Sequence, residues 1–152
     1  MQIVPIHIEK EIDSSDDLSK LILSSSQLNE GDILVVAQKI ISKQEGRIID
    51  LSTVTPSLLS EGISSQYQKD PRIVELILSE TKRIVRMKNG ILIVETNNGT
   101  ICANAGVDES NVKNGYATLL PVNSDISAQM IRNKIKEQTN KNVAVIVSDT
   151  FG

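Results

Sequence analysis

Three polar clusters in the sequence could bind a metal ion or an anion. The first is Ser148-Asp149-Thr150, which directly follows the apolar run 143–147. A carboxylate beside a hydroxyl can coordinate magnesium or manganese, and ligands usually bind at the carboxyl ends of strands in open α/β sheets. This cluster is therefore a candidate metal site. The alternative is that its residues cap a following helix.

A second cluster, residues 104–111 with the sequence NAGVDESN, combines small residues with side-chain oxygens. The small residues would let a ligand approach the backbone closely. Asp108 and Asn111 present a carboxylate and an amide three residues apart, which suits a hard metal ion that carries a nucleotide phosphate. The alternative is a turn rich in Asn, Asp and Ser for purely local reasons.

The third cluster is the lysine pair Lys39 and Lys43. If the segment after residue 36 is helical, the two ammonium groups are neighbours, and like charges at that spacing repel each other by a few tenths of a kcal/mol. An anion bound between them would relieve the repulsion. The alternative is a pair of solvated lysines with Glu45 as a nearby counter-charge.

Several other kinds of site are absent from the sequence. It contains no G-x-x-x-x-G-K-[ST] phosphate loop and no G-x-G-x-x-G fingerprint. One histidine, His7, and one cysteine, Cys102, cannot build a zinc site, so any metal would be a hard cation held by oxygen atoms. The net charge of -3 and the aromatic content of 2% argue against a nucleic-acid partner.

Apolar spacing and turn residues predict the elements that must position these clusters. Residues 33–37 and 143–147 are unbroken apolar runs, which are typical of strands covered on both faces. Asn89-Gly90 predicts a tight hairpin between strands at 83–87 and 91–95. Further strands are expected at residues 3–8 and 100–103. Helices are expected after the capping residues Ser14 to Asp17, after Thr55-Pro56, after Asp70-Pro71 and over residues 124–138. The sequence thus predicts an α/β fold of the α+β type, a mixed sheet with flanking helices.

A chain of 152 residues is the size of one domain. No apolar run reaches the roughly 18 residues that a membrane-spanning helix needs, and no basic-then-apolar leader opens the chain. We therefore expect a soluble, cytoplasmic protein with no membrane partner. Because an apolar strand ends five residues before Gly152, we also expect the chain to be part of a longer protein. The alternative is a compact domain whose final strand docks at an edge.

Four segments together, in this order along the chain, resemble the coenzyme F-420:L-glutamate ligases, also called γ-glutamyl ligases. The segments are GDILVV at 31–36, ISKQEGR at 41–47, NAGVDESNV at 104–112 and SDTFG at 148–152. The resemblance implies a γ-glutamyl-ligase-like fold that is incomplete here. Residues 1–152 would be its N-terminal part, which binds nucleotide and metal, and the remainder of the protein would be absent.

The same resemblance implies a reaction. GTP would phosphorylate the terminal carboxylate of the lactyl side chain of coenzyme F-420-0, and the amine of L-glutamate would then displace phosphate to form an amide, leaving GDP as the second product. Magnesium or manganese, with potassium as a further cation, would neutralise phosphate charge, which is the main task in such chemistry. Family members are homodimers, so a homodimer is expected as well.

The resemblance also implies roles for individual residues. Asp108 and Asp149 match metal-binding carboxylates and would thereby be the catalytic residues, while Thr150 would bind a second metal. GTP would be contacted by Gln38, Lys39, Lys43, Asn111 and the loop Glu9-Lys10-Glu11-Ile12. Two other hypotheses stay open: an inactive structural or dimerisation module of the same enzyme, and an unrelated domain that binds a divalent metal through Asp.

Overall fold

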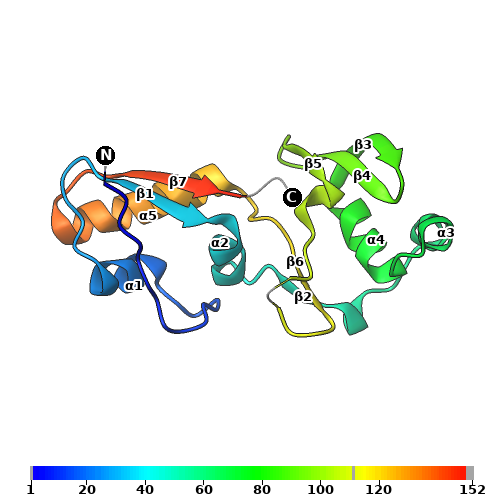
Figure 1. Cartoon of the computed structure of the whole chain (residues 1–152), viewed down its shortest axis with the longest axis horizontal. Helices are drawn as coiled ribbons and strands as arrows, with labels where there is room; N and C mark the ends of the chain where they lie inside the picture. Colours follow the sequence, from blue (N-terminus) through cyan, green and yellow to red (C-terminus); the bar gives the residue numbers. More distant parts are fainter. Residues whose placement is uncertain (1, 111, 150–152) are drawn as a thin grey trace. The chain divides into compact units, whose positions relative to one another are not determined.

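The structure, a computed structural model, describes residues 2–110 and 112–149 and divides them into two compact units (Figure 1). Unit 1 combines two segments that are far apart in the sequence, residues 2–46 and 123–149. Unit 2 consists of the intervening residues 47–122. Each unit has its own hydrophobic core. Helices and strands are mixed in both units, so the predicted mixed α/β fold class is confirmed.

Unit 1 is built on two parallel strands, β1 (Ile33–Ala37) and β7 (Ala144–Ser148), which lie side by side (Figure 1). Both strands were predicted from their apolar runs. The helices of the unit are α1 (Leu18–Ser25), α2 (Gln38–Gln44) and α5 (Ser124–Thr139). Helix α5 contacts β7 and α1, and the Lys134 ammonium on α5 lies 3.1 Å from Asp17, whose side chain caps α1.

Only one face of the β1–β7 pair is covered within the described residues. Leu34 and Val36 are buried in the core of unit 1, whereas Ile33 and Val35 are 65% and 60% exposed. On β7, Ile146 is 48% exposed and pairs with Val35. The prediction that these strands are covered on both faces is therefore wrong for this part of the chain, because the helices of unit 1 contribute to a core on one side of the pair alone.

Unit 2 contains a three-stranded antiparallel sheet in the order β3 (Thr81–Lys88), β4 (Ile91–Thr96), β5 (Ile101–Ala103). Its helices are α3 (Leu58–Tyr67) and α4 (Pro71–Ser79). A separate antiparallel pair, β2 (Ile48–Asp50) and β6 (Tyr116–Thr118), completes the strands. Two short 3-10 helices, η1 (Leu51–Thr53) and η2 (Asn104–Gly106), follow β2 and β5. The core gathers apolar side chains from α4, β4 and β6.

The predicted hairpin is confirmed. Asn89 and Gly90 have φ angles of 51° and 75° between β3 and β4, which is the left-handed backbone that a two-residue hairpin turn requires. The helix predicted after Asp70-Pro71 is also confirmed, with the Asp70 carboxylate accepting a hydrogen bond of 2.9 Å from the Arg72 amide.

Two predicted elements differ from the structure. Residues 3–8 form no strand, since Pro5 has no amide hydrogen for a ladder and the two strands of unit 1 pair with each other. The helix expected directly after Thr55-Pro56 begins at Leu58 instead, because the Ser57 side chain caps it by accepting a hydrogen bond from the Ser60 amide. None of the helices in the described part of the chain has the length and apolar character to span a membrane.

Candidate functional site

The carboxyl ends of β1 and β7 meet at one edge of their sheet. Ala37, the last residue of β1, pairs with Ser148, the last residue of β7. Gln38 and Asp149 are the next residues after each strand, so two residues that the family resemblance implied as site residues leave the sheet at the same edge. This is the edge where ligands usually bind in parallel α/β sheets. Asp149 is exposed there.

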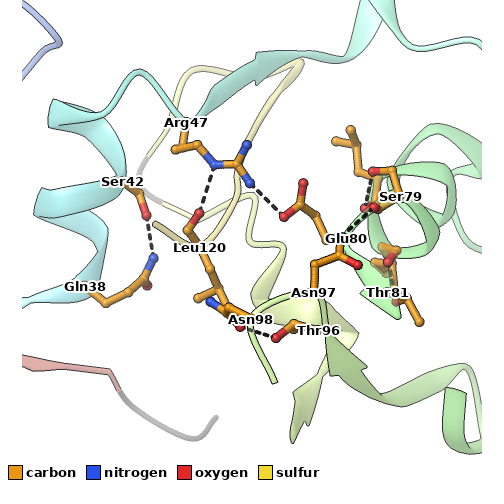
Figure 2. Close-up of polar contacts among 12 residues, drawn as sticks. Gln38, Ser42, Arg47, Ser79, Glu80, Thr81, Thr96, Asn97, Asn98 and Leu120 are labelled. Carbon is orange, nitrogen blue, oxygen red and sulfur yellow. Dashed lines mark hydrogen bonds and ion pairs between the residues drawn. The ribbon is translucent and has the colours of Figure 1, made fainter. Parts of the chain in front are cut away.

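Helix α2 begins at this edge and carries three predicted nucleotide contacts, Gln38, Lys39 and Lys43. Gln38 is buried, and its side-chain amide donates a hydrogen bond of 2.5 Å to the Ser42 hydroxyl (Figure 2). This bond fixes the Gln38 amide against the next turn of the helix. Lys39 is half-buried, and helical spacing makes it a neighbour of Lys43, as predicted.

Lys43 is held by the predicted nucleotide loop. Its ammonium group donates to the Glu11 carboxylate at 2.9 Å, and the Lys43 side chain is 11% exposed against 78% for Glu11. Glu45, the counter-charge suggested by the sequence for the lysine pair, accepts a hydrogen bond from the Ser127 hydroxyl. The alternative of a solvated Lys43 is therefore wrong, and the structure brings Lys43 and the loop of Glu9, Lys10, Glu11 and Ile12 together.

The rest of that loop is anchored at two points. Ile12 is buried in the core of unit 1. The Lys10 ammonium lies 2.5 Å from the Asp16 carboxylate. This hydrogen bond raises the pKa of Lys10 and lowers the pKa of Asp16. Glu9 is exposed. With the loop fixed before and after it, Glu11 is positioned to meet Lys43.

Asp108 belongs to unit 2, where the neighbouring backbone is tightly constrained. Its amide and carbonyl exchange hydrogen bonds of 3.0 and 2.8 Å with Thr118 at the end of β6. The Asp108 carboxylate accepts hydrogen bonds from the amide and the hydroxyl of Ser110, at 2.8 and 2.7 Å. The turn foreseen as the alternative for this cluster is thus present.

The turn before Asp108 is left-handed at three consecutive residues. Asn104, Ala105 and Gly106 have φ angles of 51°, 52° and 69°. The Asn104 side-chain carbonyl accepts a hydrogen bond of 3.1 Å from the Leu92 amide. A Cβ atom at Gly106 would lie 2.5 Å from the Leu120 side chain. The chain before Asp108 can take this path only because Gly106 has no side chain.

Arg47, the last residue of the ISKQEGR segment, has a structural role in unit 2. Its guanidinium donates to the Leu120 carbonyl at 2.9 Å and to the Glu80 carboxylate at 2.7 Å (Figure 2). Asn97 donates from its side chain to the Ser79 carbonyl next to Glu80. These contacts tie the start of unit 2 to the C-terminal end of α4 and to Leu120, which packs beside Gly106.

Two cations that the sequence analysis did not single out, Lys69 and Arg72, feel the charge of Glu109, the residue after Asp108. Arg72 pairs with Asp70 at 2.6 Å, and this hydrogen bond holds the pKa of the Asp70 carboxyl below its ordinary value. Lys69 is half-buried, and burial lowers its pKa while the charge of Glu109 acts in the opposite direction. In the sequence, the helix-capping motif Asp70-Pro71 was the only feature noted near Lys69 and Arg72. That motif predicts the start of a helix and does not predict a spatial relation to residues 104–110.

Asn111 and Thr150 lie outside the described residues. Asp108 and Asp149 belong to different units, each described by itself, so their shared metal site stays a prediction. No group of three or more His, Cys, Asp or Glu side chains within residues 2–110 and 112–149 is arranged to hold a metal ion. The donors that are described, the carboxylates of Asp108 and Asp149, are of the oxygen type that magnesium and manganese prefer, so these residues fit such an ion as part of a ligand set.

Comparison with known proteins shows which family the chain resembles. The family model described as F420-0:Gamma-glutamyl ligase matches residues 7–152. A coenzyme F420:L-glutamate ligase of Methanopyrus kandleri is 41% identical over 152 residues, which is 100% of this chain and 60% of that protein. Proteins with the same name from Methanothermobacter thermautotrophicus and Methanocaldococcus jannaschii are 43% identical, over 93% and 90% of this chain and 58% and 54% of their own lengths.

The chain therefore belongs to the F420-0:γ-glutamyl ligase family, and the resemblance of its four segments is confirmed. It spans somewhat more than half the length of these curated relatives.

Proposed function

We propose that the full-length protein is a ligase that adds L-glutamate to coenzyme F-420-0 with GTP as the energy source. Membership of the family and the names of the relatives support the glutamate ligase activity. The main structural support for the site is the pairing of Ala37 with Ser148. This pairing brings the residues that follow, Gln38 and Asp149, to the same edge of the sheet.

The proposed reaction has two steps. The lactyl carboxylate of coenzyme F-420-0 attacks the γ-phosphorus of GTP, forming an acyl phosphate and releasing GDP. The amine of glutamate then attacks the acyl carbon; the carbon–oxygen bond to phosphate breaks, the amine loses a proton, and phosphate leaves. Neither step requires a nucleophilic side chain, so the residues of this chain have to bind and orient the substrates.

In this scheme Asp108, Asp149 and Thr150 would hold magnesium or manganese, with potassium as a further cation. The bound ions supply neutralisation of the phosphate charge. Lys43 and Lys39 present ammonium groups from α2, and Gln38 presents an amide whose position is set by its bond to Ser42. Glu11 holds the Lys43 ammonium in place until a phosphate oxygen replaces it.

Thermal unfolding with GTP and manganese tests the proposal, because a ligand that binds the native state raises its midpoint of unfolding. We expect the midpoint of the full-length protein to rise with GTP and manganese together. No rise would defeat the proposed function. A rise with manganese alone, with no further effect of nucleotide, would mean that the protein binds the divalent metal without GTP and would contradict the proposed GTP dependence.

A second candidate applies to residues 1–152 alone: a structural or dimerisation module without enzymatic activity. The exposed apolar face formed by Ile33, Val35 and Ile146 favours it, since such a face is typical of an interface with further protein. A rise in midpoint for the full-length protein but not for residues 1–152 would support this module. Sedimentation of the full-length protein tests the homodimer, and a monomer would contradict it.

A further inference from the structure

Lys69 is held in a fixed position by the connection between α3 and α4. Gln68 ends α3 in the left-handed conformation, with φ of 54°. The Lys69 amide donates to the Ser64 carbonyl at 3.2 Å. The next residue, Asp70, caps α4. Because the backbone on both sides is fixed by these contacts, the direction in which the Lys69 side chain leaves the chain is also fixed.

The Lys69 side chain lies across the turn of the β3–β4 hairpin. A Cβ atom built on Gly90 would approach the Cε atom of Lys69 to 3.4 Å and the Cβ atom of Tyr67 to 3.1 Å. Gly90 therefore provides the space in which the lysine stem lies. The stem is desolvated by this packing, so Lys69 is half-buried although it follows directly on a helix end.

The Lys69 ammonium has no hydrogen-bond acceptor and no ion pair among the described residues, in contrast to the neighbouring Arg72, which pairs with Asp70. The carboxylate whose charge acts on it is Glu109, which is exposed and adjacent to Asp108. Packing on the hairpin turn removes part of the water around Lys69 and lowers its pKa, and a substrate oxyanion would supply the ammonium with a hydrogen-bond acceptor. Lys69 thus provides unpaired positive charge beside the Asp108 loop.

We propose that Lys69 binds an oxyanion of a substrate, either a phosphate or a carboxylate, next to the Asp108 loop. This inference rests on the proposed function and adds a substrate-positioning residue to it. Lysine acts as a compact point charge with three donors, so it can serve either kind of oxyanion. Glu109 acts on the ammonium only through its charge, without a hydrogen bond or ion pair among the described residues.

Three variants of the full-length protein test this role: Lys69→Gln, Lys69→Arg, and Lys82→Gln as a matched control. Lys82 is an exposed lysine of unit 2 that pairs with Glu95. We expect Lys69→Gln to raise the KM of one substrate by roughly tenfold or more while kcat changes by less than about threefold, which is the pattern of lost ground-state binding. Lys69→Arg should retain most of the affinity, and Lys82→Gln should behave as wild type.

The substrate whose KM rises identifies the oxyanion that Lys69 binds. A higher KM for GTP indicates a phosphate, and a higher KM for L-glutamate or for the coenzyme indicates an anionic group of that substrate. Calorimetric titration with inorganic tripolyphosphate and with L-glutamate gives a readout that needs no turnover. Weaker binding of one of them by Lys69→Gln but not by Lys82→Gln supports the role even if the protein ligates nothing and the proposed function fails. If Lys69→Gln and Lys82→Gln behave alike in both assays, Lys69 only packs its stem on the hairpin turn and the inference is overturned.

Discussion

The ammonium of Lys43 lies 2.9 Å from a carboxylate oxygen of Glu11, although 32 residues separate them in the sequence. Helix α2 is thereby joined to the loop that precedes α1. Glu11 is largely exposed while Lys43 is largely buried, so the lysine is confined and the carboxylate can move away. In the proposed function a phosphate of GTP replaces Glu11 at the ammonium group.

From this exchange we expect Lys43→Met to weaken binding of GTP with manganese by about tenfold or more, because a charge-assisted hydrogen bond contributes about 1.5–3 kcal/mol. Glu11→Gln should leave affinity unchanged or raise it, since the competing carboxylate is removed. Isothermal titration of the full-length variants measures both. Lys134→Met, which breaks an exposed ion pair of the same unit, is the control. Equal affinities of Lys43→Met and Lys134→Met would contradict the exchange.

Asp149→Asn in the full-length protein should abolish ligation while the free energy of unfolding changes by less than about 0.5 kcal/mol, the range usual for exposed positions. Asp149 is exposed at the carboxyl end of β7, and Asn keeps its size without the charge that a cation requires. Product formation and urea unfolding are the two measurements. Normal turnover by this variant would show that the metal assignment is wrong.

Gly106→Ala should lower the free energy of unfolding by about 2–4 kcal/mol, since it adds backbone strain at positive φ and a clash with Leu120. Gly99→Ala separates the two effects. Gly99 has φ of 86° and no atom within 4 Å of a built Cβ, so its substitution should cost only about 1 kcal/mol or slightly more. Urea unfolding of both variants tests the difference, and equal costs would rule out the close approach of Gly106 to Leu120.

Val35 and Val36 are adjacent residues of β1 on opposite faces, 60% and 7% exposed. In residues 1–152 alone, Val35→Thr should change the free energy of unfolding by less than about 0.5 kcal/mol and reduce self-association measured by light scattering. Val36→Thr should cost about 1–3 kcal/mol, because it buries a hydroxyl group. If Val35→Thr is as costly as Val36→Thr, the exposed face is covered in solution.

Acid should weaken the contribution of Asp70 to stability. In the folded protein, the hydrogen bond with Arg72 lowers the pKa of the Asp70 carboxyl group below its ordinary value of 3.8. The stabilisation by ionised Asp70 is therefore complete above pH 3.8, and it is lost as the pH falls below that value. Asp70→Asn keeps a side chain that caps helices well. Between pH 5 and pH 3 we expect the variant to lose less stability than the wild type in urea unfolding. Parallel losses would mean that Asp70 carries no such linkage.

The sequence predicted the positions of helices and strands better than it predicted which strands pair and which strand faces are covered. Unbroken apolar runs identified β1 and β7 almost to the residue, and Asn89-Gly90 identified the hairpin. The parallel pairing of β1 with β7 joins residues more than a hundred positions apart, and no local pattern specifies it. Apolar runs also indicated two covered faces, whereas Ile33, Val35 and Ile146 are exposed, because hydropathy alone does not say how much protein is present to cover a strand.

The candidate site was predictable from sequence only as separate clusters. Local charge suggested Glu45 as a counter-charge of the pair Lys39 and Lys43, whereas the contact of Lys43 with Glu11 joins residues 32 positions apart and has no local signal. Gly106 was visible as a small residue, yet nothing in the sequence signals the left-handed backbone at Ala105, a residue that rarely adopts it. Lys69 was missed because its approach to the Asp108 loop depends on the packing of α3 and α4 against the hairpin.

The division of unit 1 into two sequence segments has a consequence for biosynthesis. During translation β1 emerges from the ribosome well before β7, and all of unit 2 emerges between them. All strands of unit 2 pair with other strands of the same continuous segment. Unit 2 can therefore fold on the nascent chain while β1 is still unpaired. A compact unit 2 also shortens the distance over which β1 and β7 must find each other, which lowers the entropic cost of closing that long connection. A variant that slows the folding of unit 2 should therefore delay formation of the edge from which Gln38 and Asp149 leave the sheet.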